Sequence, residues 1–196
     1  MQDVLRIGFG VLVFGLQHSG LSALRIKHAI IDRFGKNGYH NIFTGTAILA
    51  FIFSFLMIGF WDWLYFIFRP ESIQTPLFAA GIICGAIGLW LAKKASAVIS
   101  VSTVADMRDD RTPELITEGL YGRVRHPLYL ATLLFFSGFA LLYPFLPVVI
   151  YSILMNTYLL IGAFLEERKL IIYYGEEYEQ YKKKAGFILP RLDGNE

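Results

Sequence analysis

The chain has 196 residues, of which 55% are hydrophobic and 16% are aromatic, and its mean hydropathy is +0.50. Soluble domains contain roughly 45–50% apolar residues, so this composition excludes an ordinary soluble protein and predicts an integral membrane protein. The formal net charge is only +2, and the single cysteine, Cys84, excludes an intramolecular disulfide and a cysteine-based metal cluster.

Five apolar segments approach the length of about 20 residues that a membrane-spanning helix needs. They cover residues 4–24, 44–66, 76–91, 127–143 and 145–165. Arg6 lies at the start of the first segment, as in a signal peptide, but no small-x-small cleavage pattern follows, so we expect this segment to be retained. Pro144 and Pro147 enclose a short connection, which predicts a helical hairpin of the last two spans.

The lysines and arginines are unevenly distributed among the connections. With five spans, sixteen of the eighteen fall on one side, in the first and third connections and in the tail, and only Arg6 and Arg69 fall on the other. Because cytoplasmic loops carry an excess of Lys and Arg, we expect the N-terminus outside and the C-terminus in the cytoplasm. A weakly apolar stretch at residues 95–105 is interpreted as an interfacial or continuing helix, since a sixth span would break this pattern.

The tail after the fifth segment has the pattern of an amphipathic helix. Leu170, Ile171 and Tyr174 recur at helical spacing, while charged residues occupy the other faces, and Gly175 predicts a break. We expect this helix to lie on the cytoplasmic surface and to bring its acids and tyrosines close to the loop before the fourth span. The sequence therefore predicts an all-α, polytopic membrane bundle of about five transmembrane helices with a cytoplasmic C-terminal amphipathic helix.

A polar stretch at residues 114–129 separates the long apolar runs. Proline is favoured at the first position of a helix, so Pro127 predicts a helix start. Arg125, His126 and Tyr129 then gather at a helix N-terminus, where free N–H groups favour an anion. The alternative interpretation is a basic anchor at the membrane surface followed by a helix-start residue.

His18 lies with Gln17 and Ser19 near the end of the first apolar segment. Ionisable residues inside a membrane are site candidates by default, and the alternative is a satisfied polar cluster at the interface. Histidine titrates near neutral pH, so His18 is a candidate to accept a substrate proton. His28 and His40 fall in a predicted polar loop without metal-ligand spacing, and no metal site is predicted.

Two motifs in the C-terminal half occur together at a specific spacing. The run from Arg125 to Tyr129 follows Gly119-Leu120-Tyr121 and precedes Glu166-Glu167 and Gly175-Glu176-Glu177-Tyr178. This combination resembles the isoprenylcysteine carboxyl methyltransferase superfamily of integral membrane enzymes, which use S-adenosylmethionine. The resemblance covers residues 114–190. In the N-terminal half, the run Phe14-Gly15-Leu16-Gln17-His18-Ser19 is similar to the branch that contains methanethiol S-methyltransferases and membrane proteins associated with nitric oxide reductase.

The resemblance implies a single integral membrane domain, 1–196, with variable N-terminal spans at 1–112 and a cofactor-binding core at 113–190. The cofactor would be S-adenosylmethionine, and the contact residues carried over are Leu115, Ile116, Tyr121, His126, Pro127, Leu128, Tyr129 and one or both of Glu166 and Glu167. His18 and Arg125 are the candidate catalytic residues. A family arginine that contacts a prenylated carboxylate has no counterpart, because residues 162–165 read Gly-Ala-Phe-Leu, and this favours a smaller or neutral acceptor.

The side chains fit this cofactor chemically. S-adenosylmethionine carries a carboxylate, an ammonium, a sulfonium and an adenine, for which the basic loop, the two acids and the tyrosines provide partners. The predicted function is methyl transfer to a thiol, a carboxylate or another small lipophilic acceptor that enters from the bilayer, on the cytoplasmic side. Membrane lipids are the other expected partners, and nucleic acid is not one.

Two alternative functions are compatible with a membrane helix bundle. One is a non-catalytic assembly or transport partner of a respiratory complex, which the intact motif residues disfavour. The other is a nicotinamide-dependent membrane reductase, for which the chain has no Gly-x-Gly-x-x-Gly turn.

Overall fold

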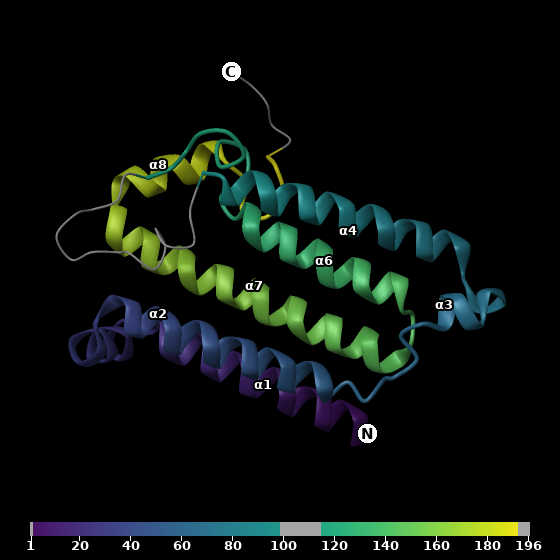
Figure 1. Ribbon diagram of the computed structural model, residues 1–196. Coiled ribbons are helices and arrows are strands. Elements are labelled where there is room, and N and C mark those ends of the chain that lie inside the picture. Colours follow the sequence, from purple (N-terminus) through teal and green to yellow (C-terminus); the bar gives the residue numbers. More distant parts are fainter. Residues whose placement is uncertain (1, 99–114, 192–196) are drawn as a thin grey trace. The chain divides into compact units, whose positions relative to one another are not determined.

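The computed structural model describes residues 2–98 and 115–191, and every regular element in those residues is a helix (Figure 1). The helices are α1 (Gln2–Ser22), α2 (Leu24–Leu56), α3 (Tyr65–Phe68), the 3-10 turn η1 (Pro70–Ser72), α4 (Thr75–Ser96), α6 (Pro127–Leu142), α7 (Leu146–Tyr174) and α8 (Glu176–Lys184). The predicted interfacial stretch at 95–105 lies partly outside the described residues. Arg108, Arg111 and the first two residues of the predicted cofactor-binding core lie wholly outside them.

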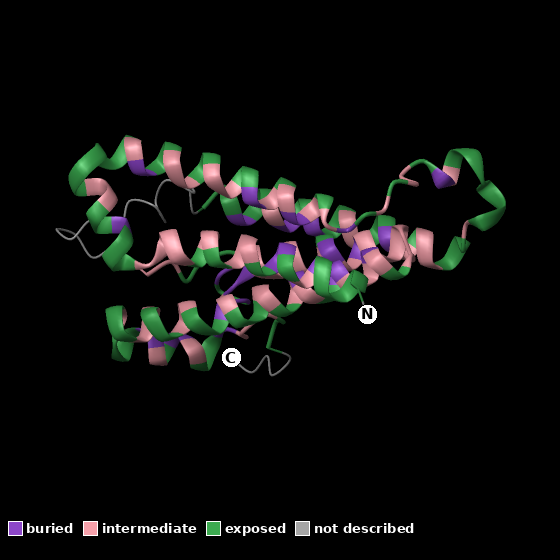
Figure 2. Ribbon diagram, turned by 90° about the horizontal axis from the view of Figure 1, so that it is seen from below, coloured by how far each residue is buried: buried purple, intermediate pink, exposed green. Residues whose placement is uncertain are grey.

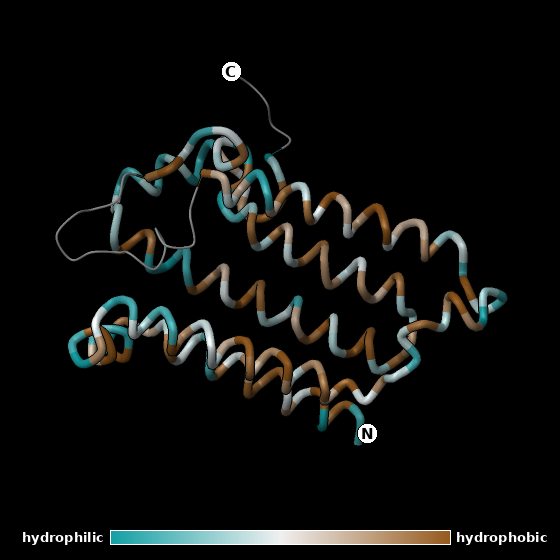
Figure 3. The backbone as a smooth tube through the Cα atoms, in the orientation of Figure 1, coloured by the Kyte–Doolittle hydropathy of each residue, from teal (hydrophilic) through white to brown (hydrophobic). Residues whose placement is uncertain are grey.

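Four of these helices, α1, α2, α4 and α7, are long and apolar enough to cross a membrane, and α6 is a shorter apolar helix of 16 residues. Hydrophobic residues predominate along these helices, whereas α8 and the first part of α2 are more hydrophilic (Figure 3). Most of the helical surface is exposed or half-buried (Figure 2), and it includes large apolar side chains such as Leu5, Leu16 and Leu89. Such a surface suits lipid, and the prediction of an all-α membrane bundle is confirmed.

The prolines and a glycine in the sequence predict several helix ends correctly. Helix α6 begins at Pro127, α7 begins at Leu146 after a short connection, and Gly175, with φ of 56°, separates α7 from α8. Proline lacks the N–H that a helix interior needs, and glycine tolerates positive φ, so these residues are found where helices begin or end.

The predictions for the second span need correction. The polar segment expected between the first two spans is helical, so His28 and His40 lie in α2 and not in a loop; only Gly35, with φ of 71°, kinks it. Tyr39 donates to the Leu21 carbonyl at 3.2 Å, which joins this part of α2 to the end of α1. The span itself ends at Leu56 and not near 66, because the backbone turns at Gly59, with φ of 64°. The helix of the fifth span, α7, continues without interruption into the predicted amphipathic segment and ends at Tyr174, at the predicted break.

The chain forms two compact units. The first contains Met1–Thr75 and Tyr143–Met155, and the second contains Pro76–Leu142 and Asn156–Glu196, so α7 contributes to both. In the first unit α1 packs along α2, and the hydroxyls of Ser54 and Tyr151 lie 3.0 Å apart in a buried hydrogen bond.

In the second unit, α6 runs antiparallel to both α4 and α7. A Cβ atom at Gly81 would meet Leu142, whereas one at Gly88 would meet Ala131, so the end of α4 lies beside the start of α6. Asn156 donates to Ser137 at 3.2 Å, which joins α7 to α6. A cluster of Tyr178, Tyr181 and Ala185 then packs α8 against the end of α7. The end of α4, the start of α6, the end of α7 and α8 are therefore at one end of this unit.

Candidate functional site

The loop of residues 115–126 is held by its own turns and by the segment that follows α8. Gly119 has φ of 62°, a conformation that suits glycine, and Tyr121 donates its N–H to the Glu118 carbonyl at 3.1 Å. An isolated parallel bridge pairs Val124 with Gly186. The N–H groups of Arg125 and His126 donate to the carbonyls of Gly186 at 2.8 Å and Phe187 at 3.2 Å. The residues just before α6 are thus fixed by backbone hydrogen bonds.

The Arg125 side chain forms hydrogen bonds and an ion pair with residues of the second unit. Its Nε donates to Glu167 Oε1 at 2.7 Å, and its Nη1 donates to the carbonyls of Ala185 at 2.5 Å and Lys182 at 3.3 Å. The guanidinium also lies over the Phe187 ring, 5.7 Å from its centroid. These contacts join the start of α6, the end of α7 and the segment after α8.

Tyr178 and Tyr181 of α8 also form hydrogen bonds with the end of α7 and with the loop before α6. The Tyr178 hydroxyl donates to Glu167 Oε1 at 3.4 Å, and the Tyr181 hydroxyl donates to the Tyr121 carbonyl at 2.6 Å. Burial raises the pKa of both phenols, so each remains a neutral hydrogen-bond donor. Leu115 packs against the same cluster.

His126 is buried beside the acids. Its side chain is 3% exposed and its ring makes edge contacts with Tyr129 and Phe187, at centroid distances of 5.5 and 5.1 Å. The Nε2 atom has no hydrogen-bond partner among the described residues and lies 3.9 Å from Glu167 Oε1, too far for a hydrogen bond. Burial lowers the pKa of His126, an effect that the charges of Glu166 and Glu167 oppose. The imidazole is therefore neutral near pH 7, with one buried nitrogen available.

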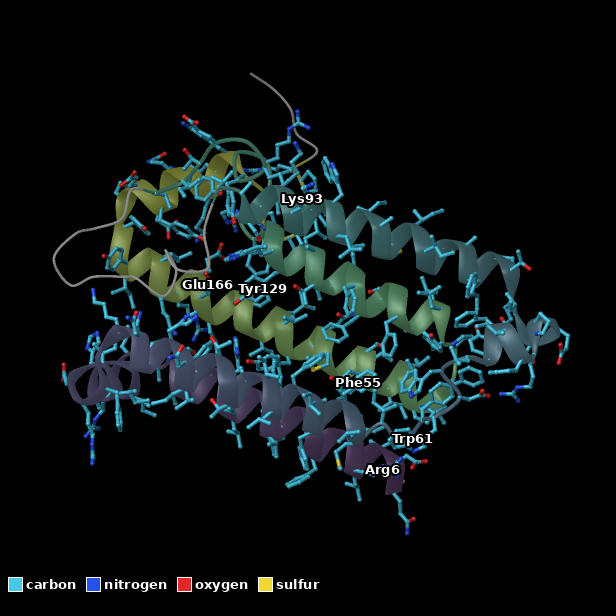
Figure 4. The ribbon with its side chains drawn as sticks, viewed as in Figure 1. Arg6, Phe55, Trp61, Lys93, Tyr129 and Glu166 are labelled. Atoms are coloured by element: carbon cyan, nitrogen blue, oxygen red, sulfur yellow. The ribbon has the colours of Figure 1, made fainter. Side chains whose placement is uncertain are left out.

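Glu166 has different neighbours from Glu167. Glu166 of α7 and Tyr129 of α6 lie next to each other (Figure 4), and the Tyr129 hydroxyl forms a hydrogen bond with the Glu166 carboxylate. Gly162, one turn earlier, lies beside this ring: a Cβ there would lie 3.5 Å from Tyr129 Cε1, an ordinary van der Waals distance. Burial, and then the charge of Glu166, raises the pKa of Tyr121 to about 12. Glu166 thus faces neutral phenols, whereas Glu167 faces a guanidinium.

Most of the sequence-derived candidates come together in this unit. Tyr121, Arg125, His126, Tyr129, Glu166 and Glu167 form one connected cluster. Buried Pro127 and half-buried Leu128 form the first turn of α6, and Ile116 is half-buried in the loop. Within the described ranges, no three His, Cys, Asp or Glu side chains form a group that could hold a metal ion.

His18 belongs to the first unit, on α1. Its ring stacks on Phe14 at 5.6 Å and lies 5.2 Å from the Phe43 ring of α2, and its Nδ1 is buried without a hydrogen-bond partner in the described part of the chain. The sequence interpretation missed Phe187 and Gly186, which fix the loop before α6. A single bridge between short segments has no periodic pattern, so the sequence gives no signal for it.

The comparisons with known proteins agree on one family. A family model described as phospholipid methyltransferase matches residues 76–177, just over half of the chain. Methanethiol S-methyltransferase 1 of Bradyrhizobium diazoefficiens is 26% identical over 91% of this chain and 64% of its own length, and methanethiol S-methyltransferase of Crocosphaera subtropica is 24% identical over 95% and 74%. Protein-S-isoprenylcysteine O-methyltransferase of Rattus norvegicus is 33% identical over 65% and 46%.

The chain thus spans slightly less than two thirds of the Bradyrhizobium relative and about three quarters of the Crocosphaera relative. No solved structure matches the chain significantly. The resemblance inferred from the paired motifs, to the isoprenylcysteine enzymes and to the methanethiol branch, is confirmed by these relatives.

Proposed function

The chain belongs to the phospholipid methyltransferase family, and we propose that it is an integral membrane methyltransferase that uses S-adenosylmethionine. The acceptor in this proposal is a thiol, a carboxylate or another small lipophilic molecule. The observation that carries the proposal is the buried His126 Nε2 without a partner among the described residues, next to the Glu166–Tyr129 pair. A buried polar atom is costly to leave unpaired, so this arrangement favours a bound ligand.

The donor set fits the cofactor. Glu166 is the carboxylate that we assign to the positive charges of S-adenosylmethionine, since Glu167 is already paired with Arg125. His126 can hydrogen-bond a polar group of the ligand through Nε2, and Tyr121 and Tyr129 provide neutral aromatic surface. When bound, the cofactor supplies an electrophilic methyl group, and much of the acceleration of such a displacement comes from proximity and alignment.

The remaining work falls to residues of the chain. Arg125 holds Glu167, Lys182 and Ala185 in place and thereby fixes the loop that carries His126. A thiol acceptor must lose its proton, because the thiolate is the nucleophile. The role of His18 as the base that takes this proton stays a prediction from the sequence. The relatives are named for methanethiol and for protein S-isoprenylcysteine. Residues 162–165, the region in which the isoprenylcysteine enzymes have a substrate-binding arginine, contain none here, and this favours a small acceptor of the first kind.

Calorimetry with S-adenosylmethionine on the detergent-purified full chain tests the cofactor assignment. We expect saturable binding to the wild type and an affinity about tenfold to a hundredfold lower in Glu166→Gln, since a hydrogen bond to a charged group contributes about 1.5–3 kcal/mol. Glu176→Gln removes an exposed carboxylate on α8 and is the matched control, with unchanged affinity. Absence of heat in the wild type would favour a non-catalytic membrane protein.

The acceptor is identified by methyl transfer from labelled S-adenosylmethionine to a panel of thiols, prenylcysteines and fatty acids. We expect thiols to be labelled. Cofactor binding with no labelled product from any of the three classes would restrict the proposal to ligand binding.

A further inference from the structure

Gln17 and His18 are two adjacent polar residues on α1, a helix that is long and apolar enough to cross the membrane. The side chain of Gln17 is oriented by α2: its Nε2 donates to Thr46 Oγ1 at 2.8 Å, and Thr46 Oγ1 donates in turn to the Ile42 carbonyl at 2.6 Å. The threonine proton is thus committed, so its oxygen can only accept from Gln17. This arrangement leaves the amide oxygen of Gln17 as the free end of the side chain.

Both residues have a buried atom without a hydrogen-bond partner in the part of the chain that the structure describes: Gln17 Oε1 and His18 Nδ1. Aromatic rings of Phe14 and Phe43 flank the imidazole, and the Phe14 ring is nearly parallel to it, at 20°. In the hydrocarbon region there is little water to satisfy such atoms, so unpaired polar groups there are costly. Polar and ionisable residues inside membranes are for this reason functional candidates.

We propose that Gln17 and His18 form a binding site for a small neutral molecule that has one S–H or O–H donor on an apolar body. The Gln17 Oε1 atom is an acceptor only, so it binds the S–H or O–H donor and repels the lone pairs of a carboxylate. A neutral imidazole can carry its proton on Nδ1, and His18 then donates to the sulfur or oxygen of the same molecule. The rings of Phe14 and Phe43 contact the apolar body. The proposal goes beyond the proposed function, since this site lies within the first unit and its ligand is inferred from these residues alone.

Lys27 provides the competing possibility of an anion site in the same unit. It is buried on α2, and its ammonium lies 5.8 Å from the ring centroid of Tyr39, which stacks on Phe43 at 5.8 Å. An anion bound near His18 would depend on this charge, whereas a neutral donor would not. Replacing Lys27 therefore separates the two possibilities.

Saturation-transfer NMR on the full chain in detergent, without S-adenosylmethionine, measures binding directly. The probes are ethanethiol, ethanol and propionate. We expect the first two to bind the wild type and propionate not to bind. Gln17→Leu and His18→Phe are each expected to weaken ethanethiol binding about fivefold to tenfold, the effect of one lost neutral hydrogen bond. Thr46→Val removes the hydroxyl that orients the amide, and we expect a loss of about twofold to fivefold.

The matched controls are Gln180→Leu and His40→Phe, which remove an exposed amide and an exposed imidazole. Both are expected to bind ethanethiol as the wild type does. Melting temperature and gel filtration monitor folding, and if Gln17→Leu does not fold, His18→Phe and Thr46→Val decide the question. Equal binding in these variants and the wild type would overturn the proposal.

Two further outcomes distinguish this inference from the proposed function. If the wild type binds S-adenosylmethionine but neither ethanethiol nor ethanol, the pair is a hydrated polar cluster and the inference is wrong, while the proposed function stands. If ethanethiol binds as expected but S-adenosylmethionine does not, the proposed function is wrong and the site stands. Propionate binding that is lost in Lys27→Met would identify an anion site and overturn the assignment to neutral donors.

Discussion

Arg125 and Glu167 form a buried ion pair, with 2.7 Å between Nε and Oε1 and with side chains that are only 9% and 13% exposed. The pair joins the loop before α6 to the end of α7, and Arg125 also holds the carbonyls of Lys182 and Ala185. The interaction thus fixes three segments of the second unit. It also distinguishes the two adjacent acids, because Arg125 forms its ion pair with Glu167 and not with Glu166.

We therefore expect Arg125→Met to destabilise the protein. Removal of one partner leaves the Glu167 carboxylate buried and uncompensated, which costs about 3–5 kcal/mol. The measurement is the melting temperature in detergent. The double variant Arg125→Met/Glu167→Met removes both charges and should melt at a higher temperature than Arg125→Met alone. Additive losses in the double variant would show that the two side chains do not interact energetically.

The buried imidazole of His126 gives a second prediction, on pH. Because burial lowers its pKa, the fold favours the neutral ring. The stability that this group contributes is present above its unfolded-state pKa of about 6.5 and is lost as the pH falls from there toward the lower folded-state pKa. We expect the wild-type melting temperature to fall between about pH 7 and pH 5, and to fall less in His126→Gln. His40→Gln, at an exposed position, should keep the wild-type pH dependence. Parallel curves for the wild type and His126→Gln would count against this explanation.

The close approach of α4 and α6 gives a third prediction. A Cβ at Gly138 would lie 2.9 Å from the Gly81 carbonyl oxygen and 3.1 Å from the Gly85 nitrogen, so Gly138→Ala must separate two backbones. Overpacking of this kind costs about 1–3 kcal/mol, and we expect a lower melting temperature. Gly85→Ala is the control on the facing helix, since a Cβ there meets nothing within 4 Å. Equal stability of the two variants would mean that the helices separate without cost.

Much of the fold follows from local chemistry that the sequence displays. The apolar runs identify the spans, and Pro127 and Gly175 mark helix ends because one lacks an N–H and the other adopts positive φ. The first part of α2 is a helix that the sequence does not predict, because its residues are polar. Hydropathy detects burial in lipid, and it does not distinguish a polar helix from a polar turn.

The candidate site was predicted as a set of residues but not as a geometry. Neighbouring helical residues project about 100° apart, so no pattern could decide which of Glu166 and Glu167 faces Arg125. The contacts of Phe187 with His126 and Phe164, at 5.1 and 4.6 Å, depend on the backbone pairing of Val124 with Gly186, which are 62 residues apart in the chain. Such pairing is a tertiary property, and single-sequence patterns do not contain it.

The last prediction concerns topology. In the second unit, the antiparallel packing of α4, α6 and α7 gathers the end of α4, the start of α6 and α8 at one end. That end carries Lys93 and Lys94 together with the α8 cations Lys182, Lys183 and Lys184. By the positive-inside rule it should be cytoplasmic. The test introduces a cysteine at exposed Glu177 in a Cys84→Ser background and labels intact cells with a membrane-impermeant maleimide. We expect labelling only after the cells are opened. Labelling of intact cells would reverse the orientation and move the proposed cofactor site to the outer side.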